Sequence, residues 1–93
     1  MEINLVHVPG IITDNEENYF LLLFGILESV DELCHLQITR VTDGYDFRIA
    51  PSAPHYLEVV FEEVLKLHNK IGIRLDISKS IKSSGAINFK IKI

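Results

Sequence analysis

The chain has 93 residues, of which 47% are hydrophobic and 24% charged, and its formal net charge is −4. This length and balance are typical of one globular domain, so we expect a single domain spanning residues 1–93. The composition excludes a low-complexity chain. The acidic balance also argues against an ordinary nucleic-acid-binding domain, since these are strongly basic.

The cysteine content, the N-terminal residues and the apolar runs indicate where in the cell the protein is located. Cys34 is the single cysteine, which excludes an intramolecular disulfide and is typical of a reducing environment. The first residues lack the basic and apolar regions of a signal peptide. The apolar run at residues 19–27 is about half of the ~20 residues that cross a bilayer. We therefore expect a soluble cytoplasmic protein without a membrane span.

The first two elements predicted along the chain are a strand and a helix. A β-prone run from Glu2 to Val8 ends at Pro9-Gly10, a pair that breaks regular structure. Thr13 and Glu16 then have the spacing of a capping box, in which each side chain satisfies the other residue's backbone amide. The helix is predicted to begin near Asp14, and its apolar periodicity continues to about Val30.

This first helix has an unusual apolar pattern. Between Tyr19 and Leu27 every residue except Gly25 is apolar, whereas a helix lying on one core needs only a stripe. A glycine inside a helix costs about 1 kcal/mol, which is more easily tolerated where another backbone approaches closely. We therefore predict that the helix buries a second surface, against another protein or a second copy of the chain. The predicted interface residues are Tyr19, Leu22, Gly25 and Ile26. The alternative is that loops and the C-terminal strand of the same chain cover this second side.

The middle of the chain predicts a β-hairpin. Two β-prone runs, 33–42 and 45–50, are joined by Asp43-Gly44, which favours a two-residue turn. This turn would pair Thr42 with Tyr45 and Ile38 with Ile49. Alternation places one apolar set on the buried face and one polar set on the solvent face. The apolar set is Leu36, Ile38, Phe47 and Ile49, and the polar set is His35, Gln37, Thr39, Asp46 and Arg48.

A second helix and two more strands follow. The helix is predicted to start at Pro51–Pro54 and to end within Asn69–Gly72. Its apolar residues follow ordinary one-sided helical spacing: Leu57, Val60, Phe61, Val64 and Leu67. Alternating apolar residues then predict strands over 73–78 and 87–93.

The predicted order is therefore β-α-β-β-α-β-β. It favours an α+β two-layer sandwich of ferredoxin-like topology, with two helices on one face of a mainly antiparallel sheet. In that topology strands one and three are parallel neighbours, so Pro9-Gly10 and Pro51–Pro54 would open at the same end of the sheet. Many unrelated functions share this topology, so the fold does not identify one.

Charge is distributed unevenly along the chain. Residues 1–46 carry nine acids and the single base Arg40, while residues 47–93 carry eight bases and four acids. A basic segment of this kind is a candidate footprint for an anion or a nucleic acid. The candidate residues are Arg74, Lys79, Lys82, Lys90 and Lys92. Solvation of the sheet face and complementarity to the acidic half are the alternative explanations, and we rank them above anion binding.

Other candidate sites are few. The loop at 78–85 combines serines, lysines and Gly85, but it lacks a Walker pattern and a following helix. The start of the second helix lacks a carboxylate before Glu58, which makes Ser52 and His55 candidate anion ligands. The histidines and Cys34 have no zinc-ligand spacing, so we expect no metal site and no cofactor. We interpret Cys34 as a small buried hydrophobe, and His55 and His68 as surface or helix-end residues. The aromatic residues Tyr45, Phe47 and Phe89 fall on core faces, where they are unable to stack with bases.

We therefore predict a non-enzymatic intracellular protein that acts by association, either with a partner protein or with itself. The first alternative is a regulator that binds an anion or a nucleic acid through the basic C-terminal third. The second is a small enzyme or ligand-binding domain at the Ser52 and His55 end, which would require a deep pocket with convergent polar groups.

Overall fold

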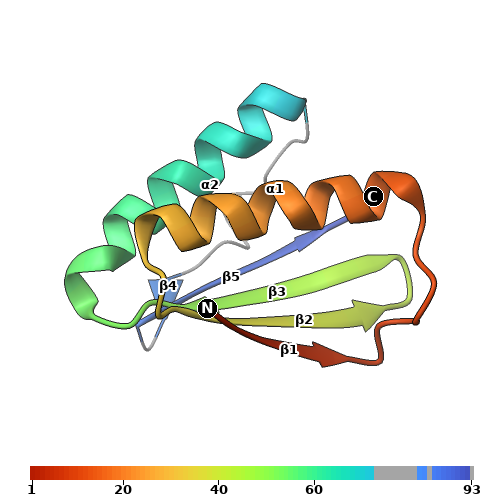
Figure 1. The fold of residues 1–93 in the computed structure, drawn as a ribbon, viewed down its shortest axis with the longest axis horizontal. Coiled ribbons are helices and arrows are strands. Elements are labelled where there is room, and N and C mark those ends of the chain that lie inside the picture. The colour runs from red at the N-terminus through yellow and green to blue at the C-terminus, as the bar shows by residue number, and fades with distance from the viewer. Residues whose placement is uncertain (73–81, 84, 93) are drawn as a thin grey trace.

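The fold is described from a computed structural model, in which residues 1–72, 82–83 and 85–92 are described. The elements are β1 (Glu2–Val6), α1 (Asp14–Val30), β2 (His35–Val41), β3 (Gly44–Ala50), the 3-10 turn η1 (Pro54–Tyr56), α2 (Leu57–Ile71), β4 (Lys82–Ser83) and β5 (Ala86–Ile91). Figure 1 shows both helices on the same side of one sheet. The predicted α+β class with two helices over a mainly antiparallel sheet is confirmed. The strand predicted over 73–78 lies outside the described residues.

The strand order is β1-β2-β3-β5-β4. β1 pairs with β2 in parallel, and β2–β3, β3–β5 and β5–β4 are antiparallel pairs. The ferredoxin-like order is not confirmed, and the expected pairing of strands one and three is wrong. The seven-residue strands β2 and β3 lie at the centre, while the five-residue β1 lies at an edge. Long apolar strands bury more surface when they have a neighbour on each side.

This order also corrects the expected common pocket. Because β3 runs antiparallel to β2 and β2 runs parallel to β1, β1 and β3 point in opposite directions. The turns at Pro9-Gly10 and Pro51–Pro54 therefore open at opposite ends of the sheet. No shared anion pocket forms between these two turns.

The hairpin forms with a register two residues from the predicted one. Val41 pairs with Gly44 and Ile38 with Phe47, so the loop is Thr42-Asp43 and Gly44 belongs to β3. A Cβ on Gly44 would lie 2.1 Å from the Ile91 carbonyl oxygen. Glycine at position 44 therefore permits the close approach of the end of β5, and it is not part of the two-residue turn.

A shift of two residues preserves the two faces of the sheet, because side chains alternate with a period of two. The predicted inward set is confirmed: Leu36, Ile38, Phe47 and Ile49 are all at most 1% exposed. Aromatic rings extend this core between the layers. Phe47 stacks on Phe89 with ring centroids 5.1 Å apart, and Phe20 meets Tyr45 edge-on at 5.2 Å.

α1 begins and ends close to the predicted residues, and α2 ends within the predicted range but begins at Leu57, after η1. Thr13 caps α1, because its hydroxyl accepts a hydrogen bond from the Glu16 amide at 3.2 Å and donates one to the Glu16 carboxylate at 2.9 Å. α2 ends at Gly72, whose φ of 78° is the left-handed conformation that glycine adopts easily. The inner residues of α2, Val60, Val64 and Leu67, are buried as their spacing predicts.

Candidate protein-interaction surface

The inner side of α1 is buried in the core of its own chain. Tyr19, Phe20, Leu23 and Leu27 are the buried residues of this helix, and each is at most 5% exposed. Tyr19 packs edge-on against the Phe47 ring at a centroid distance of 5.5 Å. The assignment of Tyr19 to an intermolecular interface is therefore wrong, because the residue is already enclosed.

The outer side of α1 remains apolar and accessible. Leu21 and Leu22 are 59% and 48% exposed. Gly25 is exposed, and a Cβ there would meet nothing within 4 Å, so no described contact within the chain uses its small size. Ile26 is partly buried against the core. Three of the four predicted interface residues thus lie together on the outer side of α1.

Two shallow hollows extend this surface, and Leu21 lines both. The first, about 500 Å³, lies between α1 and β1, and its lining residues are Ile3, Leu5, Val8, Pro9, Gly10, Ile12, Glu17, Phe20, Leu21 and Phe24. The second, about 360 Å³, lies beside α2, and its lining residues are Leu21, Leu22, Gly25, Ile26, Ser29, Val30 and Glu63. We use the name apolar strip for Ile3, Leu5, Leu21, Leu22, Phe24 and Ile26.

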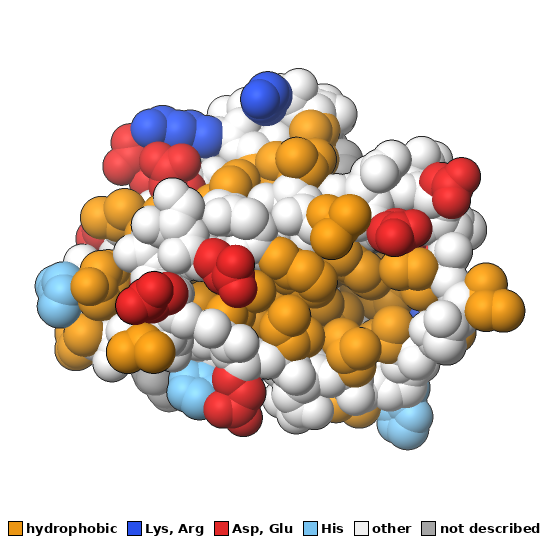
Figure 2. All heavy atoms as spheres, in the orientation of Figure 1, with side chains coloured by type: hydrophobic (Ala, Val, Ile, Leu, Met, Phe, Trp, Pro, Cys, Tyr) orange, Lys and Arg blue, Asp and Glu red, His pale blue; other side chains and the backbone are white. Residues whose placement is uncertain are grey.

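Figure 2 shows this region as hydrophobic side chains gathered across the middle of the view, where Figure 1 places α1 and β1. Acidic side chains lie around it. Glu17 and Glu63 are the charged residues that line the two hollows. Ile3 and Leu5 were not among the predicted interface residues, although their alternation in a short first strand indicates that such a strand has one apolar face.

The candidate anion site at the start of the second helix is already occupied by a carboxylate of the same chain. Asp31, only 4% exposed, accepts hydrogen bonds from the Ser52 amide at 2.7 Å and the Ser52 hydroxyl at 2.6 Å. Burial alone would raise the pKa of Asp31, but these bonds and one from the Leu33 amide outweigh it and lower the pKa. Ser52 therefore holds the β3–η1 connection to the end of α1, and its donors are engaged.

His55 packs against Tyr56 and lies near enough to this cluster for its charge to contribute to the lowered pKa of Asp31. Its ring lies 4.2 Å from the Tyr56 ring, centroid to centroid, and the side chain is exposed, as predicted for a surface residue. η1 and not α2 follows the prolines, and α2 begins at Leu57 without a side-chain cap. The prediction that Ser52 and His55 are anion ligands at the start of the second helix therefore loses its structural basis.

The described part of the chain places the side chains of two of the five basic candidates, Lys90 and Lys92. Arg74 and Lys79 lie outside it, and the side chain of Lys82 is not described. Lys90 and Lys92 both approach Asp43, with Nζ to carboxylate distances of 2.7 and 4.0 Å. The hydrogen bond from Lys90 lowers the pKa of Asp43. These two lysines thus neutralise an acid of the hairpin loop.

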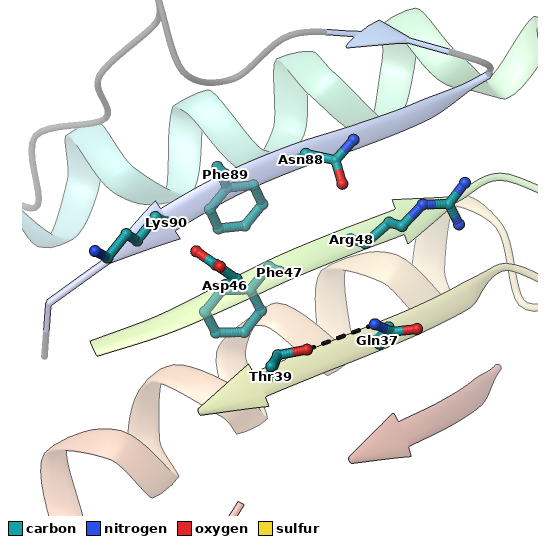
Figure 3. Close-up of a pocket in the computed structure, with 8 residues that line it drawn as sticks. All are labelled: Gln37, Thr39, Asp46, Phe47, Arg48, Asn88, Phe89 and Lys90. Carbon is teal, nitrogen blue, oxygen red and sulfur yellow. Dashed lines mark hydrogen bonds between the residues drawn. The ribbon is translucent and has the colours of Figure 1, made fainter. Parts of the chain in front are cut away.

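The solvent face of the sheet carries a polar hollow of about 460 Å³ (Figure 3). Gln37, Thr39, Asp46, Arg48, Asn88 and Lys90 line it from β2, β3 and β5. A hydrogen bond of 3.5 Å joins Gln37 to Thr39. Phe47 and Phe89 also border this hollow, yet both side chains are buried, so the prediction that they fall on the core face of the sheet is confirmed.

A buried histidine corrects the interpretation of His68 as a surface residue. His68 is 1% exposed, and its Nε2 lies 2.6 Å from the Tyr19 hydroxyl. Burial lowers the pKa of His68 to about 4, so the ring is neutral near pH 7. Its Nδ1 has no hydrogen-bond partner among the described residues. The helical spacing from Val64 and Leu67 places His68 at the margin of the inner stripe, but it does not show that a tyrosine lies opposite.

Cys34 is fully buried, as predicted, and burial raises the pKa of its thiol. No group of three or more His, Cys, Asp or Glu side chains gathers into a metal site among the described residues. In the same part of the chain, no helix combines the length and hydropathy needed to cross a bilayer. Comparison with protein-family models, curated proteins and solved structures found no significant match.

Proposed function

We propose that this protein is a small non-enzymatic domain that acts by protein association, and that the apolar strip is its contact surface. The observation that carries the proposal is the outer side of α1. The inner residues of this helix already fill the core, yet Leu21 and Leu22 remain 59% and 48% exposed beside Gly25. Contiguous apolar surface bordered by charges is typical of a protein-binding site.

The energy that association would recover supports this proposal. Ile3, Leu5, Leu21 and Leu22 together expose the equivalent of about two whole aliphatic side chains. Burying such a side chain fully contributes ~1.5–3 kcal/mol, so the strip retains roughly 3–6 kcal/mol of unused hydrophobic free energy. The reduced state implied by a single buried Cys34 is compatible with a cytoplasmic site of action, which we also propose.

The test is site-specific photocrosslinking in the cell that produces the protein. A benzophenone amino acid at Leu22 reports on the strip. The same amino acid at Val59 of α2 is the matched control, because Val59 is 47% exposed and lines neither apolar hollow. We expect a discrete crosslinked product from position 22 and none from position 59.

Equal crosslinking from both positions would mean that the reaction reports random collisions, and the proposal would fail. The absence of product from position 22, in cells and in purified protein at about 1 mM, would also refute it, because that concentration reveals even weak association. A normal far-ultraviolet circular dichroism spectrum of both variants establishes that the labelled proteins are folded.

A further inference from the structure

The outer edge of β1 offers backbone groups to another strand. β1 is the first strand in the sheet order, and only β2 pairs with it among the described residues. The Glu2 amide donates to the Cys34 carbonyl at 3.0 Å, on the β2 side. Because backbone groups alternate in direction along a strand, Asn4 and Val6 also face β2, whereas Ile3 and Leu5 direct theirs outward.

In the described part of the chain, this edge lacks several of the features that usually prevent strand addition. Exposed edges are commonly protected by lysine, proline, a bulge or a covering loop. The sequence of β1, Glu-Ile-Asn-Leu-Val, contains no lysine or proline, and its pairing with β2 is continuous from Glu2 to Val6. The strand ends at His7, whose φ of 59° turns the chain away.

We propose that a second copy of this chain adds its β1 antiparallel to this edge, about a two-fold axis at Asn4. The inference rests on the proposed function and names the occupant of the strip. Ile3 then lies opposite the partner's Leu5, and both residues direct their amide and carbonyl groups toward each other. The two symmetric pairs form four backbone hydrogen bonds and join two sheets into one.

The charges favour this antiparallel arrangement. Glu17 is the charged residue that lines the first hollow, together with Val8. Antiparallel pairing about Asn4 places the two copies of Val6, the last residue of β1, roughly 13 Å apart at ~3.3 Å per residue, beyond the screening length of about 8 Å. Glu2 lies opposite the partner's Val6 and not opposite an acid. A parallel pair would instead bring the acidic ends together.

The apolar side chains of β1 also favour the addition of a second β1 strand. Ile3 and Leu5 are paired in register with the buried Leu36 and Ile38, so they project toward the helix layer, yet they are 39% and 56% exposed. Strand addition brings Ile3 and Leu5 of both copies side by side, next to Leu21. A stable interface buries about 800 Å² per partner, more than one short strand supplies, so the dimer needs the apolar strip as well as the edge.

The experiment uses the substitution Asn4→Cys in the full chain. At a two-fold axis this residue forms a non-hydrogen-bonded antiparallel pair with Cα atoms about 4.5 Å apart, within the range of a disulfide. Glu2→Cys is the matched control, because its two copies would lie roughly 13 Å apart. The native Cys34 is fully buried. After oxidation of folded protein, we expect a disulfide-linked dimer from Asn4→Cys, and none from Glu2→Cys or the wild type.

A second pair of variants tests the backbone contact without cysteine chemistry. Leu5→Pro removes an outward amide and leaves the hydrogen bonds to β2 intact, whereas Leu5→Ala shortens the side chain and keeps the amide. Sedimentation velocity measures the dimer dissociation constant of both. We expect the proline variant to dimerise about tenfold more weakly than the alanine variant, since two interchain hydrogen bonds are lost.

The outcomes separate this inference from the proposed function. A wild-type dimer that gives no crosslink through Asn4→Cys, or an equal crosslink through Glu2→Cys, overturns the β1 pairing and leaves association through α1 standing. A wild type that stays monomeric at about 1 mM, while position 22 captures a different protein, overturns the second copy as occupant. A monomer without any product from position 22 overturns both proposals.

Discussion

The same substitution at two glycines, Gly44→Ala and Gly25→Ala, should change stability in opposite directions. A Cβ at Gly44 would lie 2.1 Å from the Ile91 oxygen and 3.0 Å from its carbonyl carbon. These are backbone atoms, so no side-chain rotation relieves the clash. At Gly25 a Cβ would meet no atom of the described residues within 4 Å, and the residue lies inside a helix.

The expected loss of stability in Gly44→Ala follows from the separation of β3 and β5 that the new Cβ requires. Restoring an ordinary contact moves the strands apart by more than about 1 Å and opens the Tyr45–Ile91 pair of β3 and β5. About two ladder hydrogen bonds at ~1 kcal/mol each are lost, together with part of the burial of Ile91. We expect a loss of about 3 kcal/mol, a large fraction of the ~5–15 kcal/mol typical of a domain.

Gly25→Ala should stabilise the protein by roughly 0.5–1 kcal/mol, because alanine is the better helix former and has space. Urea unfolding followed by circular dichroism measures both free energies of unfolding. In thermal melts, Gly44→Ala should lower the Tm by more than about 10 °C. A Gly44→Ala variant within about 0.5 kcal/mol of wild type would refute the close approach of β5.

Two further predictions concern buried polar groups. Burial lowers the pKa of His68 to about 4, whereas its value in the unfolded chain is ~6.5. Between these two pH values the unfolded chain therefore binds more protons than the folded protein. The free energy of unfolding should fall by up to about 3 kcal/mol as the pH drops from 7 to 4. Urea titrations at several pH values measure this, and His68→Gln, which retains a partner for Tyr19, should flatten the decline above pH 5; an unchanged slope would contradict the assignment. Asp31→Asn should destabilise the protein by roughly 1–3 kcal/mol, since an amide NH₂ would then face the Ser52 donors. Asp31→Asn with Ser52→Ala should cost less than the two single changes added, as a double-mutant cycle would measure; strict additivity would argue against the contact.

Much of the local structure could be predicted from the residues themselves. The Thr13 cap, the end of α2 near Gly72 and the inward face shared by Ile38 and Phe47 were predicted correctly. Each depends on neighbours in the chain or on a period of two or 3.6 residues. The apolar excess of α1 likewise predicted a second accessible face, although it did not exclude Tyr19 from that face.

Most of the errors involve partners that are distant in the chain. Gly44 looked like a turn residue, because nothing nearby shows that β5 passes within contact distance of it. Ser52 looked like an anion ligand, although Asp31 is its partner. His68 looked like an exposed helix end, although Tyr19 encloses it. In each case the deciding contact joins segments whose proximity no local pattern encodes.

By itself, the sequence determined the type, length and buried face of most elements, and it marked α1 as a helix with more apolar surface than one core needs. The tertiary structure alone decided that β1 lies at the edge beside β2, and that Ile3 and Leu5 continue the surface formed by Leu21 and Leu22. The physical reason is that periodicity reflects interactions along one segment. The order of strands depends instead on which packing of whole segments buries the most apolar surface, and short-range patterns leave that choice open.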